Sequence, residues 1–215
     1  MATDTVTVPA GSLVVVPGCA FLLPGFLSPD DCALLGPRLV DETYPKWVAQ
    51  MTLNRGWPAR VDKGHTMARF GDPGVTYDYK GKPKPVHPFT PALDAVRSRV
   101  AAALAWAPNC VVLNTYAPAS GLYPHRDGAY IPQLGPAPVI ASVSFGATRT
   151  FLLHPADPAT NKRTKGAAPA SVALSQGDLL VMHGECDRLF HHSIPEEPGA
   201  TGTRISLTFR RHLAV

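Results

Sequence analysis

The chain has 215 residues, of which 45% are hydrophobic and 17% are charged, and its formal net charge is +4. These values are those of an ordinary soluble globular protein, and the length predicts one domain over residues 1–215. The small positive charge permits a polyanionic partner without requiring one. The 23 prolines and 18 glycines argue against a helical bundle and favour short strands joined by turns.

Cysteine spacing and hydropathy bear on the cellular setting. The four cysteines are widely separated and form no C-x-x-C pair, so neither a zinc site nor a disulfide framework is indicated. No basic residue precedes the first short apolar run, and no run reaches the length of a membrane span. We therefore expect an intracellular, non-secreted protein without membrane contact, in the cytoplasm or, in a eukaryote, in the nucleus or an organelle.

Strand and helix signals begin close to the N-terminus. Two short apolar strands, each closed by a Pro-Gly turn, are predicted at residues 13–16 and 20–23. Ser28 as N-cap and Pro29 in the first turn then predict a helix. We expect it to end at Gly36 or to continue irregularly toward Val40, because glycine and proline interrupt helices.

The segment from Lys46 to Lys84 combines positive charge with aromatic side chains. Eight basic residues stand against three acidic ones, and five aromatic residues lie between them. Because clefts that bind nucleic acids need both kinds of side chain, one interpretation is a lid over a nucleotide. The other is a solvated loop whose aromatic side chains pack into the core. The candidate substrate contacts are Arg69, Tyr77, Tyr79 and Lys82.

A helix and then a series of strands follow this segment. Thr90 and Pro91 predict the start of a helix that runs to about Ala105, with a buried stripe at Leu93, Val96, Val100 and Leu104. Seven strands are predicted after it, at residues 111–116, 139–145, 150–153, 171–174, 179–182, 189–194 and 204–210. Strands in this number without intervening helices indicate a sandwich or a jelly roll.

Two connections between these strands have signals of their own. Gly177-Asp178 predicts a tight hairpin turn between the strands on either side of it. The segment at residues 154–170 is rich in Lys, Ala and Pro and predicts a mobile hairpin loop.

The last predicted strand, at residues 204–210, has two chemically different faces. Because side chains alternate along a strand, Arg204, Ser206, Thr208 and Arg210 share one face, and the other face is apolar. One interpretation is an edge strand whose polar face meets solvent. The other is a polar face that looks into a barrel, where Arg204 and Arg210 bind the two carboxylates of a small diacid through their planar guanidinium groups.

A possible metal site comes from a short motif and a distant histidine. His125 and Asp127 are two positions apart, so on extended backbone their side chains point the same way. The H-x-D pattern alone occurs by chance, but a third ligand is available at His191 or His192. Two histidines and one carboxylate form the facial triad of non-haem Fe(II) oxygenases, which leaves positions open for O2 and a bidentate 2-oxo acid.

Several short motifs follow one another in a fixed order with characteristic spacing. They are Asn114-Thr115-Tyr116, His125-Arg126-Asp127, residues 142–146 and 177–182, His192-Ser193-Ile194-Pro195, and residues 204–210. In order and spacing these motifs resemble those of the AlkB-like Fe(II)/2-oxoglutarate dioxygenases, and the resemblance covers about residues 64–211. Residues 70–74, followed by Tyr77 and Tyr79, resemble the nucleotide-recognition lid of the branch that contains the DNA-repair members.

This resemblance implies a fold, a metal site and a co-substrate site. The implied fold is a double-stranded β-helix, or jelly roll, at about residues 90–215 with its supporting helix, preceded at about 1–89 by an N-terminal extension and the lid. Fe(II) would be held by His125, Asp127 and His192, because the family pattern selects His192 over His191. The implied ligands of 2-oxoglutarate are Asn114, Tyr116, Arg204, Ser206 and Arg210.

The chain departs from the family pattern at two places. Ser206 stands where the closing motif of the family usually has Asn, which reaches farther. Gly128-Ala129-Tyr130 follows Asp127, where repair members commonly carry acidic residues.

The resemblance also implies an activity, with alternatives from other classes. The leading hypothesis is oxidative demethylation of N-alkylated bases, such as 1-methyladenine and 3-methylcytosine, in DNA or RNA. The reaction would consume O2, convert 2-oxoglutarate to succinate and release formaldehyde, in a monomer that needs no protein partner. One alternative is a hydroxylase or demethylase of a protein or small molecule, and another is a non-catalytic module that binds nucleic acids.

Overall fold

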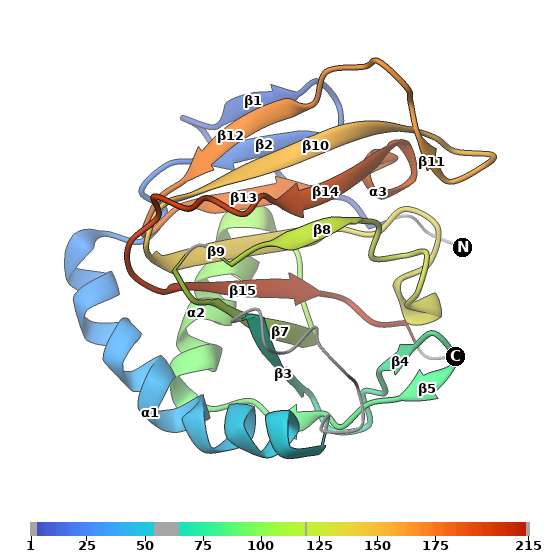
Figure 1. The fold of residues 1–215 in the computed structure, drawn as a ribbon. Coiled ribbons are helices and arrows are strands. Elements are labelled where there is room, and N and C mark those ends of the chain that lie inside the picture. Colours follow the sequence, from blue (N-terminus) through green and yellow to red (C-terminus); the bar gives the residue numbers. More distant parts are fainter. Residues whose placement is uncertain (1–3, 54–64, 119, 214–215) are drawn as a thin grey trace.

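Two facing β-sheets form the body of the computed structural model, which describes residues 4–53, 65–118 and 120–213 (Figure 1). The larger sheet has eight strands in the order β1-β2-β13-β9-β15-β7-β3-β6. Neighbouring strands in this sheet are antiparallel, except that β3 and β6 run parallel. In chain order the strands are β1 (Leu13–Val16), β2 (Ala20–Leu23), β3 (His65–Gly71), β6 (His87–Pro88), β7 (Cys110–Tyr116), β9 (Ile140–Gly146), β13 (Leu179–Met182) and β15 (Arg204–Arg210).

The smaller sheet lies over one face of the larger sheet and has the order β11-β10-β14-β8, with β12 paired to β10. Its strands are β8 (Leu122–His125), β10 (Arg149–Asp157), β11 (Lys162–Arg163), β12 (Ala170–Leu174) and β14 (Phe190–Ile194). A separate hairpin consists of β4 (Asp78–Tyr79) and β5 (Lys82–Pro83). Two antiparallel sheets that face each other in this way confirm the predicted jelly roll.

The two long helices, α1 (Pro29–Leu53) and α2 (Pro91–Leu104), cover the outer face of the larger sheet (Figure 1). The boundaries of α2 agree closely with the prediction: Thr90 is its N-cap and the predicted stripe is buried. A short helix, α3 (Cys186–Leu189), and the 3-10 helix η2 (Pro132–Leu134) complete the helices of the described residues. None of these helices is long and apolar enough to cross a bilayer.

Helix α1 is much longer than predicted, since it passes through Gly36 and Pro37 and ends only at Leu53. The prediction of an end near residues 36–40 is therefore wrong. Leu35 and Leu39, on either side of the predicted break, are both buried in the core beneath the helix. The packing of this apolar face against the sheet outweighs the local cost of glycine and proline.

The predicted hairpin at Gly177-Asp178 is also wrong. Strands β12 and β13 do not pair, because β12 lies in the smaller sheet and β13 in the larger one. The turn between them crosses from one sheet to the other. Gly177 has a φ of +84°, and its N–H donates to the carbonyl of Ser144. A hairpin turn and a turn that crosses between sheets favour the same residues, so the sequence alone cannot distinguish one from the other.

The region between residues 154 and 170 is more ordered than a loop. Strand β10 continues to Asp157 and pairs with the short strand β11, at residues 162–163. The mobile hairpin loop predicted there is in part a regular extension of the smaller sheet.

Strand β15 occupies the middle of the larger sheet, between β7 and β9. All seven of its residues are buried, so the interpretation as a solvent-facing edge strand is wrong. Its polar face looks toward the smaller sheet, and its apolar face packs under the helices. In register with it, Tyr116 stands opposite Arg204 and Asn114 opposite Ser206, so the pleat aligns these four side chains on one face.

Strand β3 belongs to the segment that was predicted to form a lid. Residues 65–71 pair along their whole length with β7, so this part of the segment is a core strand. The prediction covered residues 54–64 as well, and these lie outside the described residues.

Candidate active site

The smaller sheet brings together the three predicted metal ligands. His125 ends β8 and pairs in register with His192 on β14, and the two ring centroids are 4.2 Å apart. Asp127 lies in the turn directly after β8. Its Oδ1 is 3.5 Å from Nε2 of His125 and 3.9 Å from Nε2 of His192. One ligand atom of each residue lies within 4.8 Å of the other two, so a single ion can contact all three.

His191, the competing ligand, faces away from this group. Side chains alternate along β14, so His191 points to the outer side of the smaller sheet, where its Nε2 lies 2.8 Å from Oδ1 of Asn161. The choice of His192 over His191 agrees with the geometry.

The surroundings act on the two histidines in opposite directions. Burial by itself would lower the pKa of His125, but the hydrogen bond to Asp127 and the negative charge of that residue raise that pKa above its usual value. Nδ1 of His125 donates to the carbonyl of Tyr123 at 2.9 Å, which leaves the lone pair of Nε2 for a metal. Burial, together with nearby His125, lowers the pKa of His192 to about 3. The ring of Phe151 stacks on His192, with centroids 5.7 Å apart and an angle of 12° between the planes. The histidine is therefore neutral and fixed in orientation.

Arg210 pairs with the carboxylate of Asp127. Its Nε donates to Oδ2 at 2.9 Å, Nη2 contacts the same oxygen, and both side chains are buried. Burial by itself would raise the pKa of Asp127, but the guanidinium of Arg210 and the two histidines hold that pKa well below its usual value. Asp127 is therefore ionised, with Oδ1 free for a metal. The predicted contact of Arg210 with a diacid stays a prediction.

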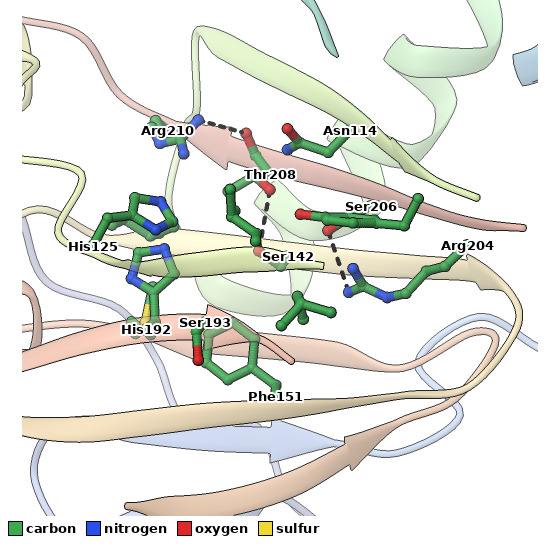
Figure 2. A pocket seen from close by; sticks show the side chains of 15 residues that line it. Asn114, His125, Ser142, Phe151, His192, Ser193, Arg204, Ser206, Thr208 and Arg210 are labelled. Carbon is green, nitrogen blue, oxygen red and sulfur yellow. Dashed lines mark hydrogen bonds between the residues drawn. The ribbon is translucent and has the colours of Figure 1, made fainter. Parts of the chain in front are cut away.

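A polar pocket extends from the metal ligands along β15. Figure 2 shows His125 and His192 at the Arg210 end of the row and Arg204 at the far end. Hydroxyl groups lie between them, and Oγ of Ser142 donates to Oγ1 of Thr208 at 3.4 Å. The polar residues that line the pocket are Asn114, Tyr116, His125, Ser142, His192, Ser193, Arg204, Ser206, Thr208 and Arg210.

Arg204 closes the far end of this pocket and is only 1% exposed. Its Nη2 donates to Oγ of Ser144 at 3.1 Å and to Oγ of Ser206 at 3.4 Å, and its guanidinium carbon is 5.4 Å from the centroid of the Tyr116 ring. Within the described part of the chain, no carboxylate forms an ion pair with it. A buried charge without a counter-ion is costly, so this end of the pocket favours an anion.

The four predicted substrate contacts have different surroundings. Arg69 lies in β3 and is buried, with its guanidinium 4.7 Å from the ring of Tyr77, so it is not available to a phosphate at the surface. Tyr77 is also buried and contacts the ring of His212. Tyr79 is partly buried and Lys82 is exposed, both on the β4–β5 hairpin.

Several residues of the site were missed by the sequence analysis. Ser142 and Ser144 line or support the pocket, and their alternation with apolar residues in a predicted strand was a usable signal. Phe151, which stacks on His192, had no such signal, because Leu152 and Leu153, which follow it, are apolar as well. Asp187, whose carboxylate binds the main chain at Asp127, also had none, because a single acidic residue in a helix of four residues has no periodicity.

A jelly roll with two histidines, one carboxylate and a buried arginine in its interior is the arrangement of an iron- and 2-oxoglutarate-dependent oxygenase. The sequence model of the 2OG-Fe(II) oxygenase superfamily matches residues 19–210, and the chain belongs to this superfamily. It is thus a dioxygenase, and the family implies the predicted Fe(II), 2-oxoglutarate and O2, which the donor set fits.

Within this class the chain is AlkB-like. It is 30% identical over 194 residues to a human protein named DNA oxidative demethylase ALKBH2, with 85% of the chain and 74% of that relative covered. It is 39% identical over 80 residues to the human alpha-ketoglutarate-dependent dioxygenase alkB homolog 3, with 37% and 28% covered. The solved structure of OsALKBH1 has the same fold, with a TM-score of 0.59, 20% identity and coverage of 94% and 100%.

Proposed function

We propose that the protein removes N-alkyl groups oxidatively from bases such as 1-methyladenine and 3-methylcytosine in DNA or RNA. The relatives that are named DNA oxidative demethylases support this substrate class. The observation that carries the chemistry is the pocket along β15, with three candidate metal ligands at one end and, at the other, the guanidinium of Arg204, which has no carboxylate partner among the described residues.

The residues of the pocket divide into two groups by role. His125, Asp127 and His192 would hold Fe(II), and Arg210 would keep the carboxylate of Asp127 ionised and oriented. Arg204, assisted by Ser206, Asn114 and Tyr116, would bind the distal carboxylate of 2-oxoglutarate. Together these residues would hold the co-substrate along the strand, between Arg204 and the metal ligands.

With Fe(II) bound, the centre supplies the oxidation of a methyl C–H bond by O2. In the overall reaction, the N-methyl base, 2-oxoglutarate and O2 yield the unmodified base, formaldehyde, succinate and CO2. The contribution of the protein is orientation and exclusion of water. Phe151 and the buried strand residues around His192 keep the metal end of the pocket dry.

We assign the contacts with the substrate to the β4–β5 hairpin, and its position next to the loop after Asp127 supports this assignment. The N–H of Lys80, in its turn, donates to the carbonyl of Tyr130 at 3.1 Å, and the rings of Tyr79 and Tyr130 are 5.6 Å apart. Tyr130 follows Asp127 by three residues, so the hairpin lies on the loop that holds the carboxylate ligand. Tyr79 would stack on a base and Lys82 would contact a phosphate. Tyr77 is buried against His212 and Arg69, so its predicted role at the base stays a prediction.

Succinate formation with matched oligonucleotides tests this function. The expected result is release of succinate and formaldehyde with an oligonucleotide that contains 1-methyladenine, and only background release with the unmethylated strand. Succinate release that does not depend on methylation would favour the alternative of an oxygenase that acts on a protein or small molecule. The reason to consider that alternative is that Gly128-Ala129-Tyr130 stands where repair members commonly carry acidic residues. Binding of oligonucleotides without any release would favour the non-catalytic module.

A further inference from the structure

Asp187 is a buried carboxylate beside the metal ligands that does not point at the metal position. It lies in α3, is 6% exposed, and precedes His192 by five residues. Its Oδ1 accepts a hydrogen bond from the N–H of Asp127 at 2.8 Å, and its Oδ2 accepts one from the N–H of Gly128 at 2.9 Å. One side chain therefore binds the two N–H groups on either side of the Cα atom of Asp127, the proposed carboxylate ligand.

We infer that Asp187 is a positioning residue for the metal centre, which holds Asp127 in the orientation that a metal requires. The inference rests on the metal ligands of the proposed function but not on its substrate. Asp127 needs such support because it lies beyond the end of β8, where no strand ladder fixes its backbone. Its side chain is held by Arg210 and its main chain by Asp187, so both are fixed before metal binds.

The hydrogen bonds of Asp187 also join the two segments that carry the ligands. Helix α3 ends at Leu189 and leads directly into β14, which carries His192. A further bond runs between the same segments, since Nη1 of Arg126 donates to the carbonyl of Arg188 at 2.9 Å. The distance between Asp127 and His192 is therefore set by contacts within this corner as well as by the pairing of β8 with β14.

Gly128 makes this arrangement possible. A Cβ atom added at Gly128 would lie 2.6 Å from Oδ2 of Asp187, which is closer than any real contact of that kind. A side chain at position 128 would therefore displace the carboxylate. This gives a physical reason for a glycine where repair members of the family commonly carry an acidic residue.

A purely structural role is the competing explanation, because two buried N–H groups need acceptors in any folded protein. The two explanations differ in what they predict for metal binding. A structural role predicts a lower unfolding temperature and an unchanged metal affinity. A positioning role predicts weaker metal binding and an altered ligand geometry in protein that is still folded.

The experiment measures Mn(II) binding to the full chain by calorimetry, without nucleic acid, and records the visible spectrum of the Co(II) form. Asp187→Asn keeps the size of the side chain but replaces one acceptor by a donor. We expect it to weaken Mn(II) binding about 10- to 100-fold, the range found for residues that support metal ligands, and to change the Co(II) spectrum. Gly128→Ala keeps the side chain of Asp187 but pushes its carboxylate aside, so it should act in the same direction.

Two further variants provide the controls. Glu185→Gln alters an exposed residue at the start of α3 whose carboxylate pairs with Arg188. The Mn(II) affinity and the Co(II) spectrum of this variant should match those of the unmodified protein. His192→Ala should abolish measurable binding. Normal Mn(II) affinity in either folded variant, Asp187→Asn or Gly128→Ala, would overturn the inference. If Asp187→Asn does not fold, the Mn(II) affinity of Gly128→Ala decides the question. Normal affinity in His192→Ala would instead show that the ligand assignment itself is wrong.

Discussion

The pocket along β15 and the β4–β5 hairpin lie close together but are built in opposite ways. The pocket side chains stand on strands of four to nine residues, and most of them are buried. All of these strands except β8, at the edge of the smaller sheet, are paired on both sides. The hairpin has two strands of two residues each, and its turn residues, Lys80 and Gly81, are exposed. It is attached by single contacts, such as the bond from Nε2 of Gln133 to Oδ2 of Asp78 at 2.7 Å.

We assign the reacting groups to the rigid pocket and the recognition of the substrate to the hairpin. In the pocket, a displaced side chain disturbs a continuous ladder of strands, so the positions of the reacting groups are fixed by the fold. In the hairpin, side chains can change with little effect on the rest of the structure. We therefore expect large effects from substitutions in the pocket, smaller ones where the two regions meet, and the smallest in the hairpin.

The largest effect is expected for Arg204→Met, which keeps the volume of the side chain but removes its charge. Loss of charge-assisted hydrogen bonds to a buried carboxylate costs roughly 2 to 5 kcal/mol, so the concentration of 2-oxoglutarate needed for turnover should rise tens- to thousands-fold. Arg204→Lys should recover only part of this, because an ammonium cannot reproduce the planar fork. Titration of 2-oxoglutarate with succinate as the readout measures both.

The matched control is Arg211→Ala, since Arg211 is exposed, lies next to β15 and pairs with Asp4 outside the pocket. It should leave the requirement for 2-oxoglutarate unchanged. Oligonucleotide binding should be nearly the same in all three variants. An unchanged requirement in Arg204→Met would mean that the polar face of β15 does not bind the co-substrate, and the contrast between the two regions would lose its chemical basis.

His212 lies where the two regions meet, and its effect should depend on pH. Its Nδ1 donates to the carbonyl of Thr76 at 2.8 Å, and burial lowers its pKa to about 4, against 6.5 for a free histidine. Between these values the unfolded chain binds a proton that the folded protein does not, so the contribution of His212 to stability is lost as the pH falls from about 6.5 to about 4. The full loss is on the order of 3 kcal/mol.

Urea unfolding of the protein and of His212→Asn, in the presence of a chelator, measures this effect. Asparagine does not titrate but can still donate to the carbonyl of Thr76. As the pH is lowered from 7.5 to 5, the unmodified protein should lose more unfolding free energy than His212→Asn does. The other titrating groups are the same in both proteins, so their contributions cancel in this difference. A difference that stays constant with pH would contradict the shifted pKa of His212.

The smallest effect is expected for Lys82→Ala in the hairpin. Loss of one phosphate contact should weaken oligonucleotide binding a few-fold and reduce the slope of log K against log salt by about 0.9. Arg38→Ala is the control, because Arg38 is an exposed residue of α1, which lies on the other side of the larger sheet. If the slope of log K against log salt is the same in both variants, Lys82 does not contact the nucleic acid.

The sequence by itself determined the features that depend on local periodicity and on motif spacing. The alternation in residues 204–210 separated the pocket face of β15 from its core face, and the capping residue Thr90 located the start of α2. The spacing of His125 and Asp127, with the later His192, predicted three side chains that the fold does bring within reach of a single ion. These predictions succeeded because each depends on side chains that are near one another in sequence or on a motif kept in fixed order.

Only the tertiary structure decided which partner each element has. Gly177-Asp178 became a crossover and not a hairpin, α1 continued past Gly36, and Arg69 was buried in β3 and not exposed in a lid. Asp187 is the clearest case, because its carboxylate contacts residues that lie about sixty positions away in the chain. Burial, sheet membership and such contacts depend on how distant segments pack, and no local pattern of residues encodes that packing.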